Sequence, residues 1–204
     1  MKRKIRLFAI GVLLGTYLCI GTAFASTEVG PGIEKPASAS DIAISETYNV
    51  YVRGVSAETE AEVNSALSKI DTDALKKFNE AGGKIYLKDH VYYNGVEVNG
   101  LCTYSDKMIL VSTHNIGNSY SVDTISDILL HEFGHYVFEC SPMSDTQRSE
   151  INQVYADWNE YNPYFYNVHE TYAQLYRYVK SNSNFMDYLS NATKQTVLDI
   201  EDQV

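Results

Sequence analysis

Residues 123–139 read DTISDILLHEFGHYVFE, and this stretch decides how the chain is interpreted. Within it, His131 and His135 are four residues apart, and four residues advance an α-helix by about 400°, so both imidazoles share one face. Leu129 and Phe133 lie on the roughly opposite face. The sequence therefore predicts a helix that packs on one side and can hold a metal ion on the other.

Glu132 directly follows the first histidine, so it lies near such an ion without being its ligand. A catalytic zinc site has three protein ligands and an open position, where the pKa of bound water falls to about 7. A carboxylate beside that water can accept its proton, which makes Glu132 the candidate general base. Two core histidines on a buried helix are the alternative, but they have no use for this carboxylate. Gly134 costs a helix about 1 kcal/mol relative to alanine, which indicates close approach of backbone or substrate.

The first 25 residues have the pattern of an export signal. Basic residues at positions 2, 3, 4 and 6 precede an apolar stretch from Leu7 to Ala23, and Ala23-Phe24-Ala25 is a small-residue cleavage site. The apolar stretch is long enough to span a bilayer, so an uncleaved N-terminal anchor is the alternative. We expect a secreted, extracellular protein with no stable membrane insertion after the signal is removed.

Removal of this signal takes four positive and no negative charges away, so the formal net charge moves from −10 to −14. This charge argues against nucleic acid or an anionic membrane surface as the target. It favours neutral or basic polypeptide substrates, although an acidic surface that only keeps the protein soluble fits equally well. We expect a monomer.

Cys102 and Cys140 remain after processing. An even number of cysteines in an exported protein permits a disulfide, and Cys140 ends the histidine helix while Cys102 lies in an expected strand. The sequence leaves open whether the two form a bridge. Nothing around Cys102 supports a role as a ligand that blocks the metal.

Beyond the signal, the chain is long enough for one domain with a real core. Residues 26–45 have the composition of a flexible leader, and 46–204 are expected to form the domain. Its fold class is α+β, with a small, mostly antiparallel sheet, and the strand Lys107–Thr113 is the candidate edge that receives a substrate. Helices are expected at 57–70, from 71 to Gly82-Gly83, at 123–139, from the Ser144/Gln147 capping box past 158, at 168–180, 185–189 and 192–201; strands at 48–52, 84–88, 91–93, 96–98, 101–104 and 107–113.

The segment Glu170-Thr171-Tyr172-Ala173-Gln174 follows His135 after 34 residues. Together with the histidine motif it resembles the catalytic domain of anthrax lethal factor and the secreted Pro-Pro endopeptidases of clostridia, over residues 121–180. The resemblance implies a helical zincin-type metalloprotease core, Zn²⁺ as cofactor, His131 and His135 with Glu170 as metal ligands, and Glu132 as general base. Thr171 and Gln174 depart from the family's Glu-aromatic-aromatic-Ala-Glu pattern. Because Gln174 replaces an acid, the hydrogen bond that this acid would make to a metal ligand is in question.

His169 competes with Glu170 for the third ligand position, because consecutive helical residues point about 100° apart and only one can face the metal. We favour Glu170, which has the family's alanine three residues on. The family also uses a tyrosine shortly before the third ligand to stabilise the oxyanion; Tyr164 is our choice, with Tyr161 and then Tyr166 as the other candidates. His90 and His114 are expected to be surface or loop histidines.

These features together predict a secreted zinc metalloendopeptidase that acts on peptides or proteins, with proline-rich substrates suggested by the resemblance. A catalytically inactive, zinc-stabilised extracellular binding domain is one alternative. A toxin component that a partner delivers into a host cell is another. The sequence does not fix the substrate.

Overall fold

The computed structural model describes residues 42–45, 48, 50–52, 56–114, 124–161 and 167–204. The helices are α1 (Ala57–Leu67), α2 (Thr72–Glu80), α3 (Ile125–Cys140), α4 (Asp145–Tyr161), α5 (Val168–Ser181), the 3-10 helix η1 (Asn184–Tyr188) and α6 (Asn191–Glu201). The strands are β1 (Ile42–Ser45), β2 (Val50–Val52), β3 (Lys84–Lys88), β4 (Val91–Tyr93), β5 (Val96–Val98), β6 (Gly100–Thr103) and β7 (Met108–Ser112).

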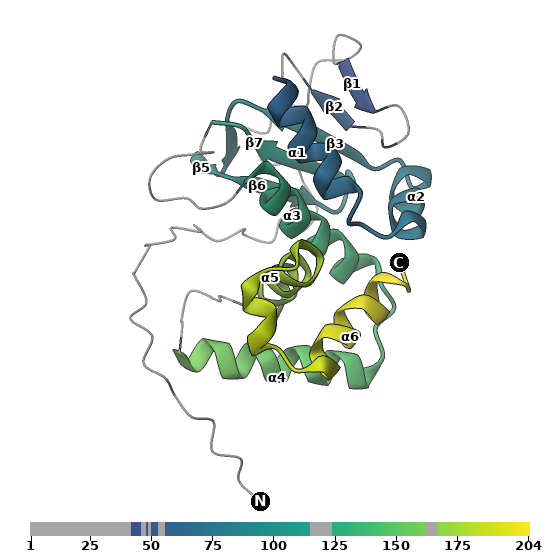
Figure 1. The fold of residues 1–204 in the computed structure, drawn as a ribbon, viewed down its shortest axis with the longest axis vertical. Helices are drawn as coiled ribbons and strands as arrows, with labels where there is room; N and C mark the ends of the chain where they lie inside the picture. The colour runs from purple at the N-terminus through teal and green to yellow at the C-terminus, as the bar shows by residue number, and fades with distance from the viewer. Residues whose placement is uncertain (1–41, 46–47, 49, 53–55, 115–123, 162–166) are drawn as a thin grey trace, which may run out of the picture.

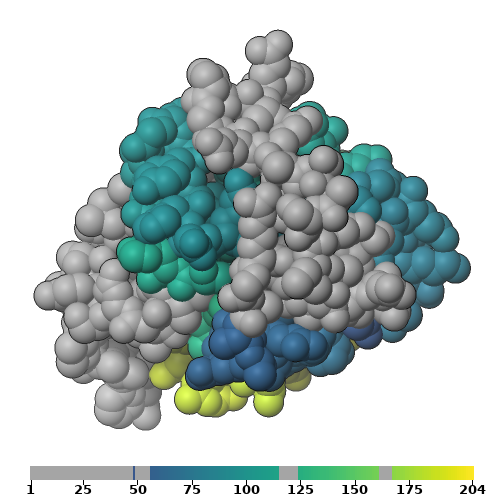
Figure 2. Space-filling model, turned by 90° about the horizontal axis from the view of Figure 1, so that it is seen from above, coloured from purple at the N-terminus to yellow at the C-terminus, as the bar shows by residue number. Residues whose placement is uncertain are grey.

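The molecule has two halves, and the histidine helix α3 runs between them. The strands lie with α1 in the upper half, whereas α4, α5 and α6 pack together in the lower half (Figure 1). Seen from above, the blue and teal surface of the sheet half faces the viewer, and the yellow C-terminal helices appear only at the lower rim (Figure 2). No helix in the described parts of the chain is long and apolar enough to cross a membrane.

The main sheet is mixed. Its strand order is β1-β2-β3-β7-β6, and β4 pairs with β5 in a separate antiparallel hairpin. The central pairs β2–β3 and β3–β7 are parallel, whereas β1–β2 and β6–β7 are antiparallel. The α+β prediction is confirmed, but the mostly antiparallel sheet is wrong at its centre. Two long connections, α1 with α2 and then β4 to β6, provide the crossovers that parallel strands require.

Strand β7 is buried along its whole length. Ile109 and Val111 face the main core under the helices, whereas Met108 and Leu110 pack on the opposite face in a smaller apolar cluster with the β4–β5 hairpin. The prediction that Lys107–Thr113 forms a sheet edge is therefore wrong, because β3 and β6 pair with its two sides. Of the described strands, β6 ends the sheet on this side.

Strand β1 lies within the range 26–45 that the sequence analysis assigned to a flexible leader. Its backbone pairs with β2, with Ile42 opposite Val52 and Ala43 opposite Tyr51. The leader prediction is thus wrong for the last four residues of that range, where Ile42 and Ile44 alternate with small residues as a strand requires. The proposed signal segment, residues 1–25, lies outside the described residues.

Capping side chains fix where α1 and α3 begin. Ser56 caps α1, and Thr124 with Asp127 forms a capping box at the start of α3. Glu62 of α1 also accepts a hydrogen bond from the Ile125 N–H at 2.8 Å. A carboxylate at this end of α3 complements the positive end of the helix dipole. Helix α1 therefore helps to hold the histidine helix in place.

Glu201 ties the lower helices to α2. Its buried carboxylate accepts hydrogen bonds from Tyr176 Oη at 2.6 Å, from Lys180 Nζ at 2.6 Å and from the Asp71 N–H at 2.8 Å. Tyr176 and Lys180 both belong to α5. Because buried charges are stable only when paired and hydrogen-bonded, this network fixes α5 against the rest of the fold.

Candidate metal centre

His131, His135 and Glu170 meet where α5 crosses α3. The Nε2 atoms of the two histidines are 3.2 Å apart. Glu170 lies 3.3 Å from His131 Nε2 through Oε2 and 3.5 Å from His135 Nε2 through Oε1. All three side chains are largely shielded, with exposed fractions of 17%, 2% and 12%. The structure therefore brings together the three ligands expected from the sequence, in a group that could hold a metal ion.

Gly134 explains how the two helices come close enough for this. A Cβ atom at position 134 would lie 2.9 Å from Ala173 Cα and 3.0 Å from Tyr176 Cβ, closer than side chains tolerate. The glycine thus lets the α5 backbone pack directly on α3, between the two histidines. Close backbone approach at Gly134 is confirmed, and the approaching backbone is that of α5.

The rotation of α5 selects Glu170 over His169. Asn167 caps this helix and accepts a hydrogen bond from the Glu170 N–H at 2.9 Å. His169 points away from the centre, with Nδ1 2.6 Å from Glu139 Oε1 and its ring 4.3 Å from that of Phe138. His169 is therefore not a member of the candidate ligand group, as we expected.

Burial and the charge of Glu170 affect the pKa values of the two histidines differently. Burial would lower the pKa of His131, but its hydrogen bond to Glu170 and that residue's charge raise it above the usual value. Burial would raise the pKa of Glu170, but the same hydrogen bond and the charges of the histidines lower it. Burial lowers the pKa of His135 to about 3, so this imidazole stays neutral. A metal cation would supply the positive charge that Glu170 otherwise finds on His131.

Glu132 has one carboxylate oxygen ready for another partner. It is only 3% exposed, and its Oε2 has no hydrogen-bond partner within the described residues. Burial raises its pKa to about 8, although a hydrogen bond from the backbone of Cys102 and the positive charge on His131 oppose this. Buried polar atoms without partners are rare, and they often mark a site for water or an ion.

Strand β6 presses against this carboxylate. A Cβ atom at position 100 would lie 2.5 Å from Glu132 Oε1, so Gly100 leaves the space that Glu132 occupies. These roles of Gly100 and of the Cys102 backbone were not predicted from the sequence. Both depend on contact between segments some thirty residues apart, and no local pattern marks them.

The amide of Gln174 supports His131 from behind. When the Gln174 oxygen faces Arg177 and Tyr178, it accepts from Arg177 Nη2 at 2.8 Å and from Tyr178 Oη at 2.7 Å. The amide nitrogen then donates to His131 Nδ1 at 3.2 Å. A histidine that binds a metal through Nε2 instead carries its proton on Nδ1 and needs an acceptor there. The opposite orientation of the Gln174 amide would supply that acceptor, but it would turn the amide nitrogen toward the Arg177 donors, so this amide fits the metal-bound state of His131 less well.

The tyrosine assignment falls outside the described residues. Tyr164 and Tyr166 lie in the segment 162–166, and the side chain of Tyr161 at the end of α4 is not described either. Tyr104, which the sequence analysis did not consider, follows β6. Burial and then the charges of neighbours that include Glu132 and Glu170 raise its pKa, so it lies near the centre.

The other candidate residues lie apart from the three ligands. Cys102 and Cys140 are both free thiols, and the bridge that the sequence permitted is not formed. Cys102 nevertheless lies near enough to Glu132 for that charge to raise its pKa, after the larger effect of burial. His90 and His114 are exposed, as expected for surface histidines, but they lie beside each other.

No family model and no curated protein matches this sequence. What the centre can bind therefore follows from its own atoms: two imidazole nitrogens and one carboxylate, held on two helices, with a second buried carboxylate beside them. Such a donor set suits a divalent metal ion of the kind that prefers nitrogen and oxygen ligands.

Proposed function

We propose that this protein is a zinc-dependent endopeptidase whose metal is held by His131, His135 and Glu170. Tetrahedral zinc sites have metal–nitrogen and metal–oxygen distances of about 2.0–2.2 Å, which puts neighbouring ligand atoms about 3.3–3.5 Å apart. The two imidazole Nε2 atoms are 3.2 Å apart and lie 3.3 and 3.5 Å from the Glu170 oxygens, and these separations are the observation that carries the proposal. The 3.3 and 3.5 Å distances run from the two imidazoles to different oxygens of Glu170, so this carboxylate faces both histidines.

The number of ligands favours catalysis over a structural role. Structural zinc sites close with four protein ligands, whereas catalytic sites keep three and leave the fourth position open. The group in the described part of the chain has three members. Glu132 stands beside them with an unpartnered oxygen, which a purely structural site does not need.

The metal, when bound, would polarise a peptide carbonyl and lower the pKa of the water at the open position. Glu132 accepts a proton through Oε2 as water attacks the carbonyl carbon, and it passes this proton to the amine nitrogen as the C–N bond breaks. The Cys102 N–H and the close packing of Gly100 hold the carboxylate in place during both transfers.

Strand β6 offers an edge to which a peptide substrate can bind. It pairs with β7 on one side and has no strand partner on the other side within the described residues. An extended peptide can add to such an edge through backbone hydrogen bonds. Because Gly100 of β6 touches Glu132, a peptide on this edge would run past the general base. We assign substrate binding to β6 in place of the strand proposed from the sequence.

Other parts of the proposal rest on the sequence. The resemblance to the lethal factor catalytic domain and the Pro-Pro endopeptidases supports a zincin-type core and proline-rich substrates, and the signal pattern in residues 1–25 supports secretion. Tyr164, with Tyr161 next, remains the proposed donor to the oxyanion, where one such donor contributes about 3 kcal/mol in the transition state.

The experiment is to compare wild type with Glu132→Gln in cleavage of a diverse peptide library that includes proline-rich members. General acid–base catalysis contributes about 10²–10⁴-fold, so the variant is expected to lose activity by that factor while it still binds one equivalent of zinc in the α3–α5 centre. A chelator should abolish wild-type cleavage, and added Zn²⁺ should restore it.

Glu80→Gln is the matched control, since it removes the same charge from an exposed position on α2. A Glu132→Gln protein that keeps both zinc and full activity would contradict the mechanism. One tightly bound zinc without cleavage of any peptide would instead favour the alternative of a zinc-stabilised binding domain.

A further inference from the structure

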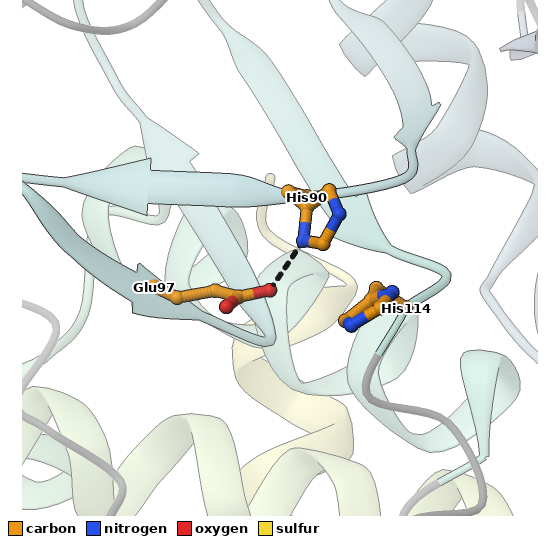
Figure 3. Close-up of side chains that lie close together, drawn as sticks. All are labelled: His90, Glu97 and His114. Atoms are coloured by element: carbon orange, nitrogen blue, oxygen red, sulfur yellow. Dashed lines mark hydrogen bonds and ion pairs between the residues drawn. The ribbon is translucent and has the colours of Figure 1, made fainter.

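A second group of metal-binding side chains lies on the sheet half of the molecule. His90 precedes β4, Glu97 is on β5 and His114 follows β7 (Figure 3). His90 Nδ1 is 2.7 Å from Glu97 Oε1, and the rings of His90 and His114 are 4.0 Å apart at their centroids. One potential ligand atom from each residue lies within 4.8 Å of the other two.

Backbone hydrogen bonds place the two histidines side by side. The His114 N–H donates to the Asp89 carbonyl at 3.0 Å, and the Thr113 N–H donates to the Lys88 carbonyl at 2.8 Å. The hairpin contributes the third member, because Val91 pairs with Val98 and this register brings Glu97 next to His90. The fold thus brings together the backbone segments that carry all three side chains.

We propose that His90, Glu97 and His114 form a second site for a divalent transition metal ion such as Zn²⁺, which joins the β4–β5 hairpin to the end of β7. Two imidazoles and one carboxylate favour zinc, copper or nickel over magnesium or calcium, which prefer oxygen ligands. Zinc ligands lie about 3.3–3.5 Å apart, so separations of up to 4.8 Å must close by roughly 1 Å, while the 2.7 Å between His90 Nδ1 and Glu97 Oε1 must widen. Both histidines are exposed, and their rings can turn by this amount without disturbing the core.

The hairpin is the element that gains most from such a link. It forms its own two-stranded sheet, and isolated hairpins are at best marginally stable in water. From this hairpin, Val91 and Val98 are buried in the small apolar cluster beneath it, and Tyr93 packs against the cluster while partly exposed. A metal ion shared by β4, β5 and the end of β7 would restrain the hairpin at the one place where all three segments meet.

This site is independent of the proposed peptidase centre, since the two share no residue or element. Their contributions can be separated by counting zinc bound to the metal-free full chain in calorimetric titrations. Wild type is expected to bind two equivalents, His114→Ala one, His135→Ala one and the double variant none. Glu97→Gln should also lose the surface equivalent, whereas the matched Glu80→Gln protein on exposed α2 should keep both.

A second readout avoids any variant that fails to fold. In wild type with the first equivalent bound, further Zn²⁺ should shift the NMR signals of the His90 and His114 rings together, and Mg²⁺ at the same concentration should not. The proposal is overturned if His114→Ala still binds two equivalents, if wild type binds only the one that His135→Ala removes, or if Mg²⁺ gives the same ring shifts. If wild type bound zinc at the surface site but not at the α3–α5 centre, the proposed peptidase centre would be wrong and the surface site would still be supported.

Discussion

Two groups of two histidines and one glutamate are held in opposite ways in this molecule. His131, His135 and Glu170 are fixed on two packed helices and shielded from solvent, with donor atoms 3.2–3.5 Å apart. The other group lies on a hairpin and a strand end, with its two histidines exposed and its atoms up to 4.8 Å apart. The residue types are the same, so the difference lies in what surrounds them.

Burial and helix packing thus hold the side chains of a site in place before any ligand binds. The buried group has already lost the side-chain freedom that metal binding would otherwise cost, whereas the exposed group must still lose it. The buried group should therefore bind zinc more tightly, and it should depend on residues that never touch the metal. The exposed group should depend on its own three residues alone.

The largest expected effect is on the network that fixes α5. Glu201→Ala removes the partner of Lys180, Tyr176 and the Asp71 N–H, and the loss of one member of a buried ion pair costs about 3–5 kcal/mol. Urea denaturation should show this loss in the free energy of unfolding, and zinc affinity at the α3–α5 centre should fall with it. Glu80→Ala, which breaks an exposed ion pair with Lys76, should change stability by less than about 0.5 kcal/mol. Equal effects of the two variants would show that Glu201 does not hold the site.

The next prediction compares two glycines that are needed for different reasons, Gly134 for close helix packing and Gly95 for its positive φ. Gly134→Val forces side-chain atoms into the α5 backbone, and such overpacking costs about 1–3 kcal/mol. It should also push α5 from α3 and weaken zinc binding there. Gly95→Ala in the hairpin meets no atom within 4 Å but has a φ of +79°, so it should cost about 1 kcal/mol through backbone strain alone. Thermal unfolding and zinc titration of both proteins test this, and unchanged zinc affinity in Gly134→Val would contradict it.

A smaller effect concerns the amide behind His131. Gln174→Glu supplies a fixed acceptor for the His131 Nδ1 proton, and Arg177 and Tyr178 are in place to donate to the new carboxylate. Residues that orient metal ligands change affinity by about 10–100-fold, so the variant should bind zinc more tightly by a factor in that range. Competition with a chelator measures the change. Gln203→Glu adds the same charge at an exposed position and should leave the affinity as it is, and an equal gain there would mean that net charge alone is responsible.

The smallest effect is expected at the surface group without metal. The hydrogen bond between Glu97 and His90 is partly exposed, so Glu97→Gln in the presence of a chelator should lower the free energy of unfolding by less than about 1 kcal/mol. Denaturation with and without zinc distinguishes this from a loss of metal-dependent stability. A large loss without zinc would mean that the group is already organised, and the contrast with the buried centre would then disappear.

Helices and their boundaries were largely predictable because their signals are local. Ser56 caps α1, and Ser144 with Gln147 forms the predicted box before α4, with the Ser144 N–H donating to Gln147 Oε1 at 2.8 Å. Spacing alone also put His131 and His135 on one face of α3. These signals act within one turn of helix, so they can be read without knowledge of the rest of the fold.

Strand pairing was not predictable in the same way, because alternation gives the period of a strand but not its neighbours. The run Met108-Ile109-Leu110-Val111 did contain a usable signal, since consecutive apolar residues are typical of a strand buried on both faces. The contacts of Gly100 with Glu132, and of His90 with His114, join distant segments. They follow from the topology of the sheet, which the sequence analysis did not predict correctly.

The pairing of distant segments at the centre of the sheet also bears on how the chain folds. The hairpins β4–β5 and β6–β7 join neighbouring segments, and such hairpins form in about 1–10 μs. The β2–β3 pair and the packing of α5 on α3 join segments about thirty or more residues apart, and contacts of this kind slow folding. His90 and His114 come together only when β7 pairs with β3, and Glu170 reaches His131 and His135 only when α5 docks. Both groups of histidines are therefore complete only after distant segments of the chain have packed together.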